Sequence, residues 1–150
     1  MVTTRDRIAA FPLLATLSPA HLDLLTSAAA EVCYATRERL FFQDEPALGC
    51  WLILEGRVAI DSLVLGRGHE TVAVAGPGEV VGWSWLVPPL RWRFGAVALT
   101  PVAAIRLDTT CLRAMMAGDP EFALLITDAM RAVAAQRGDA VEPRFATRYR

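Results

Sequence analysis

The chain has 150 residues, of which 54% are hydrophobic and 21% charged, and this length and composition are typical of one globular domain with its own core. Its net charge of -1 lacks the basic surplus that binding to a nucleic-acid backbone requires, so direct DNA binding is not expected. All 15 basic residues are arginine, which excludes enzymes that use a lysine as nucleophile or Schiff base.

The first predicted element is a helix over residues 19–31. Ser18 supplies an N-cap and Pro19 suits the first helical position, and an apolar stripe continues to Val32. The pattern changes at Cys33, where the helical periodicity ends.

From Cys33 onward, short apolar runs are separated by Gly, Pro and Asp, a pattern typical of a many-stranded sandwich or barrel. Gly56 divides two such runs and can take the positive φ that a tight hairpin needs. The segment 66–69 divides the next pair in the same way. The expected strands cover residues 39–43, 50–55, 57–65, 70–75, 94–99 and 103–107.

Helical periodicity returns after Leu107. A short helix is predicted over 109–117, and Asp119-Pro120-Glu121 opens a longer one that ends at Gly138. Residues 139–150 show no apolar periodicity and are expected to form a flexible C-terminal tail, which leaves 1–138 as the domain. The fold class is therefore α+β and mainly β, with strands that close on themselves or fold into two sheets.

The segment 77–96 holds the candidate ligand-binding site. A Gly-Glu-x-x-Gly turn at 78–82 leads into a short helix, then two prolines and an extended strand, a layout that can present backbone N–H groups to a phosphate. The candidate ligand-binding residues are Gly78, Glu79, Gly82, Trp83, Ser84, Trp85, Arg91, Trp92 and Arg93.

This arrangement resembles the cyclic-nucleotide-binding domain of the catabolite-activator and Fnr-like regulators and of cAMP-dependent kinase regulatory subunits. The resemblance covers residues 11–137. It implies a jelly-roll β-roll, or double-stranded β-helix, with an N-terminal helix and two C-terminal helices, a non-enzymatic signalling role, and cAMP or cGMP as ligand without any cofactor. Its carriers are Glu38-Arg39-Leu40-Phe41, Gln43-Asp44-Glu45, the run from Trp51 through the hairpin Glu55-Gly56-Arg57 to Val58, and Pro77-Gly78-Glu79-x-x-Gly82.

Two charged contacts of that family are replaced. In nucleotide-binding members a second glutamate follows the second glycine and holds the ribose, whereas Trp83 follows Gly82 here. The arginine that neutralises the cyclic phosphate falls on Trp92, and a one-residue slip would bring Arg91 or Arg93 to that place. A hydrogen bond to a charged group contributes about 1.5–3 kcal/mol, so losing both moves a micromolar affinity toward millimolar.

Two interpretations of the aromatic residues follow. Trp83, Trp85 and Trp92 either fill the vacated nucleotide cavity or line a pocket for a base, an aromatic effector or a haem edge. Arg91 and Arg93 are either a bidentate clamp for a phosphate or carboxylate, or solvated charges at a strand edge.

The favoured hypothesis is a stand-alone regulatory module with weak or lost cAMP and cGMP binding, acting through a protein partner or another ligand. The alternative is a working nucleotide sensor that uses Arg91 or Arg93. By analogy with the family, the helix over 119–137 is expected to form a homodimer seam. The residues after Arg137 are too few for a DNA-reading domain.

Other functional classes find little support in the sequence. A metal-dependent jelly-roll enzyme needs clustered ligands, but His21 and His69 stand alone and are expected to have surface or capping roles. No motif for nucleophilic catalysis occurs.

The cysteines and the apolar runs predict the location. Cys33, Cys50 and Cys111 are odd in number without Cys-x-x-Cys spacing, so they are expected to be small buried hydrophobes in a reducing compartment. No apolar run reaches the roughly 18 residues that span a bilayer. A cytoplasmic location is therefore predicted.

Overall fold

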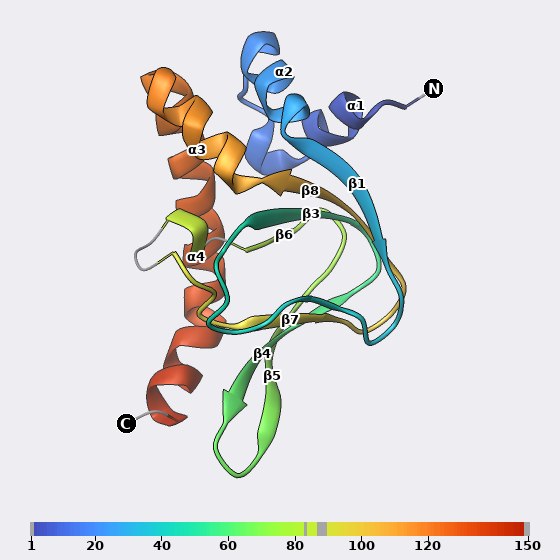
Figure 1. The fold of residues 1–150 in the computed structure, drawn as a ribbon, viewed down its shortest axis with the longest axis vertical. Coiled ribbons are helices and arrows are strands. Elements are labelled where there is room, and N and C mark those ends of the chain that lie inside the picture. Colours follow the sequence, from blue (N-terminus) through green and yellow to red (C-terminus); the bar gives the residue numbers. More distant parts are fainter. Residues whose placement is uncertain (1, 83, 87–89, 149–150) are drawn as a thin grey trace.

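Two four-stranded antiparallel sheets face each other in the computed structural model, which describes residues 2–82, 84–86 and 90–148, with side chains as far as Ala135 (Figure 1). The strand order is β1-β8-β3-β6 in one sheet and β2-β7-β4-β5 in the other. This is the predicted α+β β-roll. The elements are α1 (Thr4–Ala9), η1 (Pro12–Leu14), α2 (Pro19–Ser27), β1 (Ala29–Tyr34), β2 (Arg39–Phe41), β3 (Gly49–Glu55), β4 (Val58–Val64), β5 (Gly68–Ala75), β6 (Val80–Val81), η2 (Ser84–Leu86), β7 (Gly95–Ala98), β8 (Val102–Asp108), α3 (Thr109–Gly118) and α4 (Pro120–Arg148).

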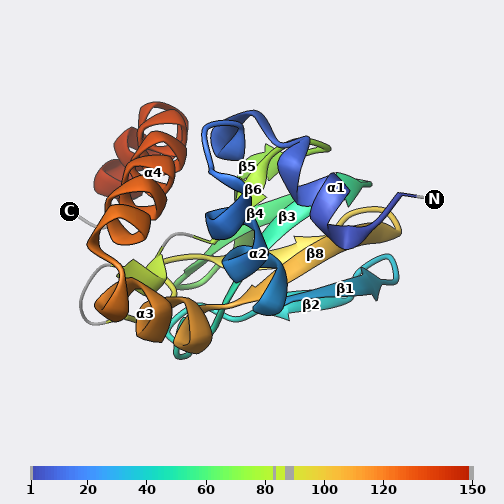
Figure 2. The ribbon, with the colours of Figure 1, turned by 90° about the horizontal axis from the view of Figure 1, so that it is seen from above.

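Helices enclose the roll on two sides. In Figures 1 and 2, α1 and α2 lie over the sheet that contains β1 and β8, and α4 runs along the side of the roll. Helix α4 turns one apolar stripe inward, and Phe122, Ile126 and Val133 on it are buried. Strand β3 is buried at every position from Gly49 to Ile53, as expected for a strand covered on both faces.

The predicted first helix ends earlier than expected, at Ser27, and residues 29–31 belong to a strand instead. Alanine and glutamate favour a helix locally, but β1 pairs with β8 over six positions, from Ala29 opposite Leu107 to Tyr34 opposite Val102. The long-range ladder therefore overrides the local propensity, which the sequence pattern alone does not reveal.

Three further differences concern short or terminal elements. Helix α1, capped by Thr3, and the two-residue strand β6 were not predicted, because segments so short have no measurable periodicity. Helix α4 does not end at Gly138 but continues to Arg148, since glycine costs only about 1 kcal/mol in a helix interior. The flexibility of residues 139–150 stays a prediction, and Tyr149 and Arg150 lie outside the described residues.

Within the described residues, no helix combines the length and the apolar character that crossing a bilayer demands.

Candidate ligand-binding site

The Gly-Glu turn of the predicted site is held by its own hydrogen bonds. Glu79 Oε1 accepts from the Gly76 N–H at 2.9 Å, and the backbones of Gly78 and Glu79 bond to Ile53 at 2.9 and 3.0 Å. Gly78 has a φ of 86°, which explains the glycine. Glu79 therefore anchors the turn onto β3, and this hydrogen bond occupies one of its carboxylate oxygens.

Gly82 is the point where the backbone and an indole ring come closest. Its φ is 98°, and a Cβ added there would lie 2.9 Å from Trp92 Cη2 and 3.0 Å from Trp92 Cζ3. Only glycine fits this position, because any side chain would collide with a ring that is itself packed. The Trp92 ring therefore lies directly against the second glycine of the Gly-Glu-x-x-Gly turn, and both belong to the segment 77–96.

Trp92 belongs to an aromatic stack inside the roll. Its ring stacks on Phe41 with a centroid separation of 3.8 Å and an interplanar angle of 18°, and Trp51 lies 5.2 Å from Phe41 and 5.9 Å from Trp92. Trp92 is only 3% exposed. Its backbone N–H donates to Glu45 O at 2.9 Å and its carbonyl accepts from the Asp44 N–H at 2.8 Å, and these two bonds fix the main chain from which the ring projects.

Ser84 and Trp85 are buried at the short helix η2. Ser84 Oγ accepts from the Arg93 N–H at 3.5 Å, and Trp85 is fully buried. Burial raises the pKa of the neighbouring Cys50 thiol to about 12, although the Trp85 indole acts on it in the opposite direction. Among the described residues, no hydrogen-bond acceptor lies in bonding geometry with Trp85 Nε1. Trp83 lies outside the described residues.

The two candidate arginines lie at different depths. Arg91 is exposed, forms an isolated β-bridge with Pro46, and donates from Nη1 to Asp44 O at 2.8 Å. Arg93 is partly buried and has interactions of its own. The structure thus brings Gly82, Ser84, Trp92 and the Arg93 backbone together, while the Arg91 side chain is engaged at the loop surface.

A buried ion pair beside the site was missed by the sequence analysis. Arg39 and Asp61 join β2 to β4, with Nη1 3.2 Å from Oδ1 and side chains 17% and 5% exposed. His69 Nδ1 lies 3.8 Å from Asp61 Oδ2. The available signal was Asp61 itself, a charge inside the apolar strand 58–64, yet its partner is 22 residues away.

The histidines and cysteines differ from expectation in two places. His21 is buried rather than superficial, with Nε2 3.1 Å from Asp119 Oδ2 and its ring 5.4 Å from Phe122. Cys33 is exposed because β1 is an edge strand, whereas Cys50 is buried and Cys111 half-buried. In the described part of the chain, no group of three or more His, Cys, Asp or Glu is placed to hold a metal.

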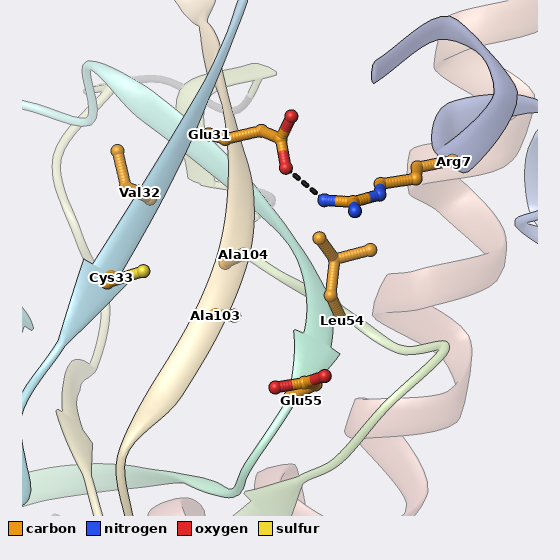
Figure 3. A pocket seen from close by; sticks show the side chains of 8 residues that line it. All are labelled: Arg7, Glu31, Val32, Cys33, Leu54, Glu55, Ala103 and Ala104. Carbon is orange, nitrogen blue, oxygen red and sulfur yellow. Dashed lines mark hydrogen bonds and ion pairs between the residues drawn. The ribbon is translucent and has the colours of Figure 1, made fainter. Parts of the chain in front are cut away.

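A groove of about 390 Å³ on the first sheet lies apart from the predicted site (Figure 3). Its guanidinium, that of Arg7, points at Glu31 and forms an ion pair with it, while Glu55 and Cys33 line the walls. Since its cation is already paired, this groove offers no free positive charge to an anion.

The comparisons with known proteins agree with the fold. The family model for the cyclic nucleotide-binding domain matches residues 31–119. A putative cyclic nucleotide-binding protein from Geobacter metallireducens is 22% identical, with a TM-score of 0.81 over 90% of this chain and 98% of its own.

Two longer proteins share the fold. The catabolite activator protein of Thermus thermophilus is 24% identical, with a TM-score of 0.70 over 91% of this chain and 62% of its own. The regulatory subunit of a cAMP-independent protein kinase A from Trypanosoma brucei is 18% identical, with a TM-score of 0.74 over 89% of this chain and 46% of its own. No curated protein matches the sequence.

Proposed function

The chain belongs to the cyclic nucleotide-binding domain family, and we infer that it is a regulatory module whose nucleotide cavity is filled by its own aromatic side chains. The observation that carries this inference is the position of Trp92. The residue that replaces the phosphate-binding arginine is 3% exposed, stacked on Phe41 and pressed against Gly82.

A cyclic nucleotide could enter the cavity only after the Trp92 ring had moved off Phe41, so this displacement would have to precede any contact between the nucleotide and the protein. Moving a buried indole out of a packed core costs about 3–5 kcal/mol, judged from truncations of buried tryptophan. The absent phosphate and ribose contacts remove about 1.5–3 kcal/mol each. Together these terms shift a micromolar affinity beyond millimolar. The module therefore acts through a protein partner or a ligand of another kind.

The alternative, a working sensor that uses Arg91 or Arg93, is less well supported. Arg91 is exposed and donates to Asp44 O, away from the buried cavity. Arg93 stays the better candidate of the two because its backbone N–H donates to Ser84 Oγ at the start of η2. A fold of this kind also occurs in the regulatory subunit of a kinase described as cAMP-independent.

Calorimetric titration with cAMP and with cGMP tests this function. We expect no binding in the micromolar range. A dissociation constant of micromolar size would contradict the inference, and the double variant Arg91→Ala with Arg93→Ala would then show whether an arginine is responsible.

A gain-of-function variant provides the matched comparison. Trp92→Arg combined with Trp83→Glu restores both charged positions that the family resemblance implies. We expect this double variant to bind cAMP at least about tenfold more tightly than the native chain. Equal binding by both proteins would mean that Trp92 is not what blocks the cavity. Circular dichroism confirms that the variant is folded.

A further inference from the structure

A second opening reaches the aromatic stack from another side. It has a volume of about 280 Å³ and lies between β1, β2, β3 and β8, with the loop from β2 to β3 along one wall. Tyr34, Phe41, Trp51 and Trp92 all line it. An apolar cavity of about 150 Å³ is enough for benzene, so this one has room for a fused bicyclic ring. Phe41, Trp51 and Trp92 are only 8%, 4% and 3% exposed, so a small part of each ring reaches the opening, where offset or edge-to-face contacts favour a planar occupant.

A single cation stands at this opening. Arg106 lies opposite Trp51 on β8, and its guanidinium carbon is 5.5 Å from the Trp51 ring centroid. Nη2 donates to Leu48 O at 3.0 Å, which positions the planar group and leaves further N–H donors of the guanidinium available. Among the residues that the structure describes, Arg106 forms no ion pair. A half-buried arginine without a carboxylate partner is suited to a ligand carboxylate, which its fork can bind through two parallel hydrogen bonds.

Two further polar groups define what fits beside Arg106. Trp51 Nε1 donates to Tyr34 Oη at 2.9 Å, so the hydroxyl keeps its own proton to donate. Glu45 also lines the opening, and its Oε1 accepts from the Phe42 N–H at 2.9 Å. The Glu45 carboxylate repels any anion at this opening, and it repels a multiply charged phosphate more strongly than a monocarboxylate, whose single charge is matched by Arg106.

We propose that this opening binds a small planar aromatic monocarboxylate, with the ring held among Tyr34, Trp51 and Trp92 and the carboxylate bound to Arg106. This inference rests on the proposed function, because the back wall of the opening is Trp92 in its stacked position. A ligand bound there would contact the Trp92 ring, which also lies against Gly82, so binding would act directly on the conformation of the segment 77–96.

The test uses indole-3-acetate as probe, titrated by calorimetry into the full chain, with neutral indole and cAMP in parallel. A ligand of this size is expected to bind with a dissociation constant between about 10 μM and 1 mM. Arg106→Gln should weaken binding of indole-3-acetate at least about tenfold, and neutral indole should bind more weakly than the acid by a similar factor. Arg131→Gln is the matched control, because Arg131 is 77% exposed on α4 and outside the opening.

The outcomes separate the two proposals. Binding of indole-3-acetate that is lost in Arg106→Gln and kept in Arg131→Gln supports the site. No binding up to about 5 mM, or equal affinity in Arg106→Gln and the native chain, overturns it. Micromolar binding of cAMP instead refutes the proposed function, whatever the aromatic probe does. Tyr34→Phe provides a second variant: it keeps the ring but removes both the hydroxyl donor and the acceptor of Trp51 Nε1, so a weaker affinity for the acid than in the native chain is expected.

Discussion

At the scale of single residues, the buried ion pair between Arg39 and Asp61 is the place where a substitution is expected to lower stability most. Asp61 is 5% exposed and its attraction to Arg39 offsets the cost of removing a carboxylate from water. The pair occupies space that a neighbouring side chain would need, since a Cβ at Gly95 would lie 2.5 Å from Asp61 Oδ1 and 2.7 Å from Arg39 Nη1. The ion pair in this position therefore requires a glycine at residue 95.

Removing one partner should destabilise the protein strongly. Asp61→Asn leaves the Arg39 guanidinium without its counter-charge, and we expect the free energy of unfolding to fall by about 3 kcal/mol. Urea unfolding followed by circular dichroism measures the change. Asp23→Asn is the control, because the Asp23 side chain is 67% exposed in its pair with Arg5 and such pairs contribute about 1 kcal/mol at most. Similar losses in the two variants would refute the structural role of the buried pair.

Gly95→Ala tests the close approach itself. The added methyl group collides with both members of the pair, so a loss of about 1–3 kcal/mol in unfolding free energy is expected. Gly118→Ala serves for comparison, because a Cβ there meets nothing within 4 Å and the residue ends helix α3. The idea fails if Gly95→Ala unfolds at the same urea concentration as the native chain.

At the scale of elements, the junction of α2, α3 and α4 depends on one carboxylate. Asp119 Oδ1 accepts from the Phe122 N–H at 3.0 Å and so caps α4, while Oδ2 contacts His21 Nε2 on α2. The Phe122 backbone hydrogen bond is the main reason why the pKa of Asp119 lies below its usual value. One side chain therefore fixes both the start of α4 and its position relative to α2.

The lowered pKa of Asp119 predicts the sign of a pH dependence. Because the folded-state pKa is below the unfolded one, the carboxylate stabilises the fold fully above the unfolded value, and this contribution is lost as the pH falls through the folded pKa. Asp119→Asn should therefore be less stable than the native chain at neutral pH, and the difference should shrink in acid. Urea midpoints of both proteins across the acid range check this. Asp128→Asn, exposed on the same helix, should show no such convergence.

For the whole molecule, the long helix α4 is the element available to join two copies. Its buried stripe is used by its own roll, so a second copy would have to contact the opposite side, where Leu124 is 62% exposed. We propose a homodimer through this helix, as the sequence analysis predicted for residues 119–137. The interface would then bury Leu124, a large apolar side chain that is exposed to solvent in the single chain.

Sedimentation velocity tests this assembly. The native chain is expected to sediment as a dimer and Leu124→Glu as a monomer, because two facing carboxylates would be buried without partners. Arg131→Gln, exposed on the same helix, is expected to leave the dimer intact. A native monomer at concentrations well above micromolar would rule the seam out.

The sequence by itself determined the β-roll and predicted a ligand-binding segment at residues 77–96. Glycine positions and apolar runs are local signals, and Gly56, Gly78 and Gly82 all have the positive φ that these turns need. The family resemblance implied that Trp92 stands where a phosphate-binding arginine is expected, but left open whether its ring fills the cavity or lines one. Only the tertiary structure shows that this ring stacks on Phe41 and lies near Trp51, because these two residues precede Trp92 by about 50 and 40 positions in the chain. The same holds for β1, the Arg39–Asp61 pair and the His21–Asp119 contact: each is stabilised by a partner far along the chain, and periodicity and local propensity carry no information about such partners.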